Sequence, residues 1–198
     1  ARRIGAHFVT TYHGAYNAAN PIKNLYNSVM ARGEKVIAIS DFIASQVQQC
    51  HRIENDRIVT IHRGVDVDLF DPQKTSAERI IQLANAWRLQ DGMPVIMLPG
   101  RLTRWKGQSV LIDALGHLGR DDVRCLLVGS DQGRNRYRQH LDKLVRDRGL
   151  QHIVHIVDNC SDMPAAYMLA DVVVSASTDP EAFGRVAVEA QAMGRPVV

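Results

Sequence analysis

Cysteine is scarce in this sequence of 198 residues. The three cysteines, Cys50, Cys125 and Cys160, lie far apart, and no two of them form a C-x-x-C pair. An odd number of cysteines at such spacings argues against a disulfide framework and against a cysteine zinc site. We therefore expect reduced thiols, which are typical of a cytoplasmic protein.

A long apolar run and an excess of one charge are also lacking. No run approaches the roughly 20 apolar residues that a membrane-spanning helix needs. The net charge is only +3, and the scattered basic residues are not accompanied by a recognisable nucleic-acid module, so no nucleic-acid binding is predicted. The first residue is Ala1 and not methionine, so we expect the true N-terminus to lie further upstream.

Short apolar runs alternate with longer amphipathic stretches along most of the sequence. This alternation predicts an α/β fold, in which a parallel sheet is covered by helices on both faces. A polar stretch with Asp71-Pro72 and Asp91-Gly92 interrupts it and predicts an interdomain linker over residues 67–92, with a short helix near residues 79–89. The predicted domains are residues 1–66 and 93–198. The predicted strands are 8–12, 36–39, 58–61, 95–98, 124–128, 153–157 and 172–174, and the predicted helices are 22–32, 42–50, 106–118, 137–148, 164–170 and 182–193.

Polar motifs follow these strands, and parallel sheets bind ligands at the carboxyl ends of their strands. After the strand at 95–98, Gly100 allows a sharp turn, and Arg101 and Lys106 lie near the start of a predicted helix. Two cations beside a helix N-terminus favour binding of a diphosphate. The alternative is an ordinary solvated basic loop, but the glycine turn and the helix start favour the binding site.

A second motif follows the strand at 172–174 and runs from Asp179 to Glu189. Glu181 precedes a predicted helix, where a carboxylate often only complements the helix dipole. Glu189 has apolar neighbours on both sides, and a carboxylate in such surroundings needs a partner or a ligand. Gly184 leaves the backbone N–H groups open to a close ligand.

Together these residues resemble the group 1 (family 4) retaining glycosyltransferases. The resemblance is carried by Gly100-Arg101-Leu102 with Lys106-Gly107, by Glu181 and Glu189 with Phe183-Gly184 between them, and by Ala190-x-Ala192-x-Gly194-x-Pro196-Val197. In addition, Arg63-Gly64-Val65-Asp66 is similar to the family's Asn-Gly-Val-Asp, and Tyr12-His13-Gly14 is similar to its His-Gly. The likeness extends over nearly the whole chain.

The resemblance implies the GT-B fold, which consists of two Rossmann-like domains with the nucleotide sugar between them. Residues 1–66 would be the C-terminal part of the acceptor-side domain, and residues 93–198 the nucleotide-sugar-binding domain without its end. We therefore expect this chain alone to be inactive. The implied catalytic residues are Glu181, Arg101, Lys106 and His13, and the implied donor-binding residues are Gly100, Arg101, Lys106, Phe183, Gly184, Arg185, Glu189, Asn159 and Cys160.

Each of these residues has an implied role. Arg101 and Lys106 would hold the diphosphate, Glu189 the ribose hydroxyls, and the segment around Asn159 and Cys160 would lie near the base. Glu181, with the backbone of residues 183–185, would hold the transferred sugar and the phosphates, and His13 would reach towards that sugar. Fixed cations stabilise the charge of a departing nucleoside diphosphate. Since neither of the two motifs that follow the strands at 95–98 and 172–174 contains an Asp-x-Asp pair, we expect a metal-independent reaction without a cofactor.

The implied activity is transfer of a hexose, with retention, from a UDP- or GDP-sugar to a glycan or lipid-linked acceptor. Bacterial surface polysaccharide or lipopolysaccharide biosynthesis is the expected setting. The basic run Arg134, Arg136 and Arg138 is a solvated face or a peripheral contact with anionic lipid at the inner face of the plasma membrane. Two alternatives stay open on the same fold, a nucleotide-sugar isomerase of the 2-epimerase type and a non-catalytic nucleotide-binding module.

Overall fold

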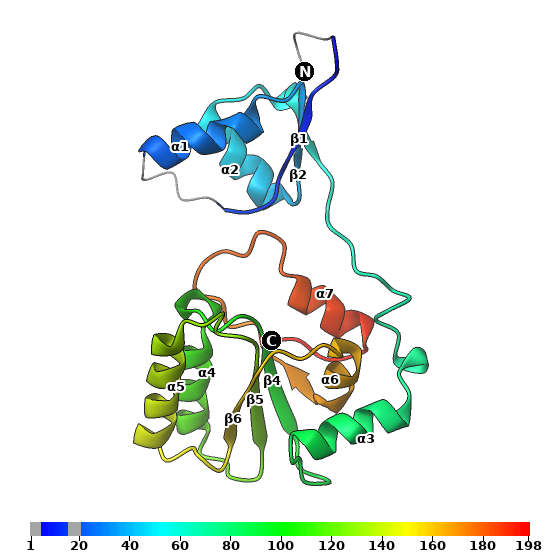
Figure 1. Ribbon diagram of the computed structural model, residues 1–198, viewed down its shortest axis with the longest axis vertical. Coiled ribbons are helices and arrows are strands. Elements are labelled where there is room, and N and C mark those ends of the chain that lie inside the picture. Colours follow the sequence, from blue (N-terminus) through cyan, green and yellow to red (C-terminus); the bar gives the residue numbers. More distant parts are fainter. Residues whose placement is uncertain (1–4, 16–20) are drawn as a thin grey trace. The chain divides into compact units, whose positions relative to one another are not determined.

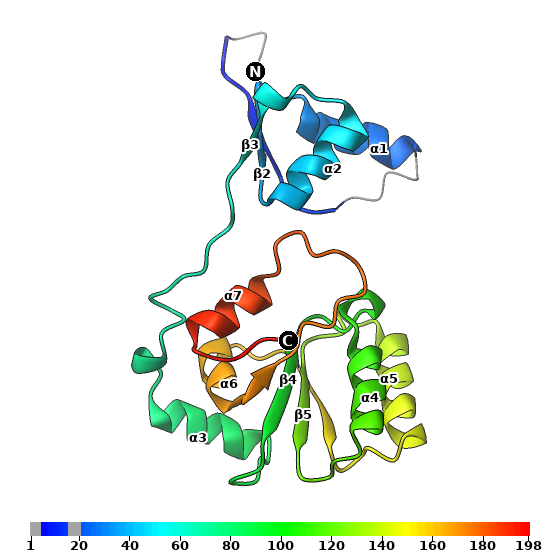
Figure 2. The same cartoon turned by 180° about the vertical axis from the view of Figure 1, so that it is seen from behind.

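A computed structural model describes residues 5–15 and 21–198 of the chain. The chain forms two compact units, which Figures 1 and 2 show from opposite sides. The first unit comprises residues 1–64 together with the short segment Pro180–Gly184, and the second comprises Val65–Asp179 and Arg185–Val198. Among the described residues, no helix has both the length and the apolar character that crossing a membrane requires.

The first unit contains a parallel three-stranded sheet in the order β1-β2-β3. These strands are Val9–Tyr12, Lys35–Ala38 and Ile58–Thr60, each within one residue of the predicted bounds at either end. The helical segments are α1 (Pro21–Asn27), η2 (Ser28–Ala31), α2 (Asp41–His51) and η3 (Asn55–Arg57). The core lies between the sheet and α2, where Val36, Ala38, Ile43 and Val47 are fully buried.

The second unit contains a parallel four-stranded sheet in the order β6-β5-β4-β7. The strands are β4 (Val95–Pro99), β5 (Arg124–Val128), β6 (Val154–Val157) and β7 (Val172–Val173), and they also match the predicted bounds to within one residue. Beyond β7, Val197 forms a parallel bridge with Val173.

Helices cover both faces of this sheet, as the apolar character of its strands predicts. One face packs against α4 (Gln108–Leu118) and α5 (Asn135–Asp147), which contribute Leu111, Ile112 and Leu141 to the core. The other packs against α6 (Met163–Leu169) and α7 (Arg185–Ala192), together with residues of α3 (Ala77–Ala86). Figure 1 shows these two groups of helices on opposite sides of the strands.

Residues 67–92, predicted as a linker, group with the second unit. They include η4 (Pro72–Lys74) and the expected short helix, which is α3. The side chain of Arg79 on α3 donates hydrogen bonds of 2.9 and 2.6 Å to the carboxylate of Asp162, which caps α6. Leu83 and Trp87 add apolar contacts to the core beneath α6. The C-terminal part of this stretch is therefore held against the second unit.

Two predicted helices begin later than the sequence indicates. The helix predicted from residue 106 begins at Gln108, after the short turn η5 (Arg104–Lys106), and the helix predicted from residue 182 begins at Arg185. A glycine at positive φ precedes each start, Gly107 at +72° and Gly184 at +77°. A left-handed residue cannot continue a right-handed helix, so each helix begins after its glycine. Consequently Glu181 lies in the loop before α7 and not at the first turn of the helix.

Candidate functional site

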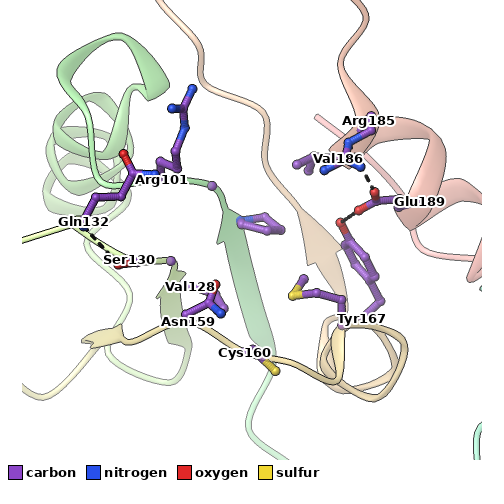
Figure 3. Close-up of a pocket in the computed structure, with 14 residues that line it drawn as sticks. Arg101, Val128, Ser130, Gln132, Asn159, Cys160, Tyr167, Arg185, Val186 and Glu189 are labelled. Carbon is purple, nitrogen blue, oxygen red and sulfur yellow. Dashed lines mark hydrogen bonds and ion pairs between the residues drawn. The ribbon is translucent and has the colours of Figure 1, made fainter. Parts of the chain in front are cut away.

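A pocket of about 270 Å³ opens at the carboxyl ends of β4, β5 and β6 in the second unit (Figure 3). The loops after these three strands form one side, and helices α6 and α7 form the other. Its position is the one at which parallel sheets bind their ligands. Its lining includes the predicted site residues Gly100, Arg101, Asn159, Cys160, Arg185 and Glu189.

The loop after β4 reaches the pocket because two glycines let it cross the end of β5 closely. The Gly100 amide donates to Val128 O at 2.9 Å, and the Leu102 amide donates to Ser130 O at 3.0 Å. A Cβ atom on Gly129 would lie only 2.0 Å from the Gly100 carbonyl oxygen, so this crossing requires glycine. Leu102 is buried in the core, while Arg101 stays exposed at the pocket.

Gln108, the first residue of α4, connects that helix to the same loop. Its side chain is fully buried. Its Nε2 donates to the carbonyl oxygen of Arg101 at 2.9 Å, and its Oε1 accepts from the hydroxyl of Tyr137 at 3.4 Å. Gln108 was not among the predicted site residues, although a glutamine between Gly107 and an apolar helix face needs hydrogen-bond partners once it is buried.

Glu189 faces the opposite side of the pocket from α7, and only 15% of its side chain is exposed. Its Oε2 accepts a 2.9 Å hydrogen bond from the hydroxyl of Tyr167 on α6, and its Oε1 lies 3.9 Å from Nε of Arg185. Figure 3 shows Tyr167 rising from α6 to meet Glu189, on the side of the pocket opposite Arg101. Glu189 therefore has the polar partner that its apolar sequence neighbours demand.

Tyr167 is a residue that the sequence analysis missed. Burial, and then the nearby carboxylate of Glu189, raise the pKa of its hydroxyl well above the usual range, so that it stays protonated and remains a donor. A usable signal was present in the sequence, because a tyrosine inside the apolar helix predicted at 164–170 needs a hydrogen-bond partner once it is buried.

Asn159 and Cys160 come directly after β6 and line the pocket beside Met163. Cys160 is partly buried, and this burial raises the pKa of its thiol. A protonated thiol is a weak nucleophile and a poor metal ligand. Asn159 therefore offers an amide and Cys160 a protonated thiol to a ligand in this pocket.

Five predicted site residues do not line this pocket. Lys106 lies in η5, where its Nζ is 4.5 Å from the centroid of the Trp105 ring. Glu181, Phe183 and Gly184 belong to the segment that groups with the first unit. His13 also belongs to the first unit, where its Nδ1 lies 2.8 Å from Nη2 of Arg63.

The comparison with known families agrees with this arrangement. The family model described as glycosyl transferases group 1 matches residues 80–198, and the model of Glycosyltransferase Family 4 matches residues 1–69. This chain belongs to the group 1 glycosyltransferases. The resemblance stated from the sequence motifs is thereby confirmed, and the motifs that carry it lie in the matched regions.

Similar group 1 glycosyltransferases are found among curated proteins and among solved structures. The D-inositol 3-phosphate glycosyltransferase of Xylanimonas cellulosilytica is 34% identical over 175 residues, which cover 83% of this chain and 42% of that protein. A glycosyltransferase of Rickettsia africae has 38% identity and a TM-score of 0.88, covering 99% of this chain and 52% of that one. Anabaena HepE in complex with UDP-glucose has 29% identity and a TM-score of 0.81, covering 96% of this chain and 52% of that one.

These similarities confirm the predicted α/β fold as that of the GT-B glycosyltransferases. The chain spans about two fifths of the length of the Xylanimonas relative and about half the length of each of the two solved structures.

Proposed function

We propose that this chain is part of a glycosyltransferase that moves a hexose from a nucleoside-diphosphate sugar to an acceptor. The observation that carries the proposal is the pocket itself, which has Arg101 on one side and the mostly buried carboxylate of Glu189 on the other. A nucleoside diphosphate needs both groups, a cation for its phosphates and an acceptor for its ribose hydroxyls. UDP is the favoured nucleotide because Anabaena HepE has been solved with UDP-glucose, and GDP is the alternative.

The diphosphate would lie between Arg101 and the start of α7. Arg185 and Val186, the first two residues of α7, line the pocket, so the free N–H groups of this helix start lie beside the proposed ligand site. From the sequence, the start of α4 was predicted to bind the diphosphate, but Gln108 at that start does not line the pocket. Lys106, on the short turn η5 that follows the same loop, is the second proposed cation.

The nucleoside would lie against Glu189 and the loop after β6. Tyr167 uses Oε2 of the Glu189 carboxylate, and Oε1, which lies 3.9 Å from Nε of Arg185, would accept from a ribose hydroxyl. Asn159 offers an amide, which can both donate to and accept from a base. Cys160 and Met163 give the base a polarisable surface beside that amide.

Fixed cations would supply the chemistry of the leaving group. Negative charge develops on the diphosphate as the glycosidic bond breaks, and groups that are already oriented stabilise this charge without rearranging. We propose that Arg101 and Lys106 fill this role without a metal ion. Following the family resemblance, Glu181 and His13 would contact the transferred sugar, and attack from the side of the departing phosphate would retain the anomeric configuration.

Two acceptor classes are supported by different observations. The sequence resemblance favours a glycan or a lipid-linked acceptor in bacterial surface polysaccharide or lipopolysaccharide synthesis. The curated relatives are named as D-inositol 3-phosphate glycosyltransferases, which favours a phosphorylated cyclitol instead. For a lipid-linked acceptor, the exposed Arg134 and Arg136 would face anionic headgroups at the inner face of the plasma membrane.

Calorimetric titration of this chain with UDP, GDP and ADP tests the donor pocket. We expect selective binding of one diphosphate and its loss in Glu189→Ala. Glu54→Ala is the matched control, because it removes an exposed carboxylate from the first unit. Equal binding by Glu189→Ala and the unmodified chain would contradict the proposed site. Product analysis with the longer natural protein separates the alternatives, since an isomerase releases the epimer without an acceptor and a binding module turns over no donor.

A further inference from the structure

Tyr167 is fully buried, and yet its hydroxyl end lines the pocket. Its ring packs edge-on against Phe70, with ring centroids 6.0 Å apart, and it lies in the core together with Ala166 and Ala170. Its hydroxyl donates to Oε2 of Glu189. A side chain fixed by packing on all sides holds its hydroxyl in one place.

The carboxylate of Glu189 has little else to hold it. Among the residues that the structure describes, its only hydrogen bond comes from Tyr167. Arg185 Nε is 3.9 Å away, which is too far for a hydrogen bond, and 67% of the Arg185 side chain is exposed. An ion pair of this length, whose arginine is mostly exposed to solvent, orients its partner weakly. The direction of the carboxylate therefore depends on Tyr167.

We propose that Tyr167 is a positioning residue for nucleotide recognition, which fixes Glu189 so that its Oε1 meets the ribose hydroxyls. This inference rests on the proposed function and adds a residue to its site. A carboxylate turned by a bond rotation would present both oxygens differently, and the hydroxyls of a bound ribose would lose their acceptor. Tyr167 would therefore contribute to affinity only when the ligand carries these hydroxyls.

The test compares two ligands on two proteins by calorimetry. UDP carries the ribose hydroxyls, and 2′,3′-dideoxyuridine 5′-diphosphate lacks them. We expect Tyr167→Phe to weaken UDP binding about tenfold, the effect of a hydrogen bond to a charged group, and to leave binding of the dideoxy compound unchanged. A purely structural role would not produce this difference, because a damaged pocket weakens both ligands alike.

Several outcomes would overturn the inference. Unchanged UDP affinity in Tyr167→Phe would show that the hydroxyl is not needed, and equal weakening or loss of both ligands would assign Tyr167 to the core alone. Tyr26→Phe is the matched control, because it removes the hydroxyl of an exposed tyrosine in the first unit. Binding of the dideoxy compound also reports that the pocket of the variant is folded.

Glu189→Ala separates this inference from the proposed function. If the unmodified chain binds UDP more tightly than the dideoxy compound, and Glu189→Ala removes that difference, the ribose contact is established whatever Tyr167 does. If Tyr167→Phe then keeps the difference in affinity between UDP and the dideoxy compound, only the positioning role is overturned. If neither variant nor the unmodified chain distinguishes the two ligands, the proposed ribose contact itself is wrong and the inference falls with it.

Discussion

Gln108 Nε2 donates a 2.9 Å hydrogen bond to the carbonyl oxygen of Arg101, so a fully buried side chain holds the backbone of a pocket residue. The other end of the same amide accepts from Tyr137 on α5. The loop that carries Arg101 is thus tied to two helices of the second unit as well as to the end of β5. This restraint fixes the backbone of Arg101 before any ligand arrives, which is the condition for electrostatic stabilisation without rearrangement.

Gln108→Leu is expected to loosen that loop. It leaves the Arg101 carbonyl and the Tyr137 hydroxyl without their partner, and an unsatisfied polar group in a partly buried place costs about 1–3 kcal/mol. Urea unfolding should show this loss in the free energy of unfolding, and UDP titration should show weaker binding. Gln139→Leu makes the same replacement at an exposed position of α5 and should change neither quantity. Full stability in Gln108→Leu would contradict the argument.

Gly107→Ala is expected to be among the most damaging single substitutions near the site. Gly107 has φ of +72°, and a Cβ atom there would lie 1.8 Å from the carbonyl oxygen of Ala176. The left-handed conformation alone costs alanine about 1–2 kcal/mol, and the clash with backbone adds to this cost. We expect a clear fall in the melting temperature by circular dichroism.

Gly119→Ala separates these two costs. Gly119 also has positive φ, at +64°, but a Cβ atom there would meet nothing within 4 Å. Only the conformational cost of about 1–2 kcal/mol therefore applies. Equal destabilisation by the two substitutions would show that the close approach of Gly107 to Ala176 does not matter.

The strands could be predicted from the sequence because a parallel sheet covered on both faces needs continuous apolar runs, and these are visible at residues 95–99 and 124–128. The first residues of α4 and α7 could not be predicted from the sequence. The helices predicted from residues 106 and 182 include Gly107 and Gly184, and only the folded backbone shows that these glycines adopt positive φ. Helix starts are set by such local conformations, which a single sequence indicates weakly.

For the candidate site, the sequence patterns indicated two charged residues that line the pocket and did not indicate the residues that contact them. Arg101 and Glu189 could be predicted because charged groups beside a strand end or among apolar neighbours need an explanation. Tyr167 lies 22 residues from Glu189, and Gln108, although it is only seven residues from Arg101, also contacts Tyr137 on a different helix. Their roles depend on tertiary contacts that local sequence patterns do not encode.

The ion pair between Arg79 and Asp162 predicts a dependence of stability on pH. The hydrogen bonds from Arg79 hold the pKa of Asp162 below its ordinary value of 3.8. This contribution is therefore present above pH 3.8 and is lost as the pH falls through the lowered pKa of the folded state. Since both side chains are partly exposed, we expect less than ~1 kcal/mol from it.

Asp162→Asn tests this dependence by urea unfolding at neutral and at acidic pH. The variant should be less stable than the unmodified chain at neutral pH, and the difference should shrink as the pH falls below the ordinary range of an aspartate. Asp121→Asn, at an exposed position, is the control. A difference that stays constant with pH would mean that the charge of Asp162 contributes nothing.

Arg101→Ala should separate recognition of the diphosphate from recognition of the nucleoside. If Arg101 binds the phosphates, the variant should lose about tenfold in UDP affinity and keep its affinity for uridine, because the uncharged nucleoside makes no use of the guanidinium. The loss should decrease at high salt, since screening weakens the same interaction in the unmodified chain. Arg136→Ala removes an exposed arginine from α5 and should behave like the unmodified chain with both ligands. Equal losses of affinity for UDP and uridine would mean that Arg101 stabilises the conformation of its loop and does not bind the phosphates. The diphosphate would then need another cation.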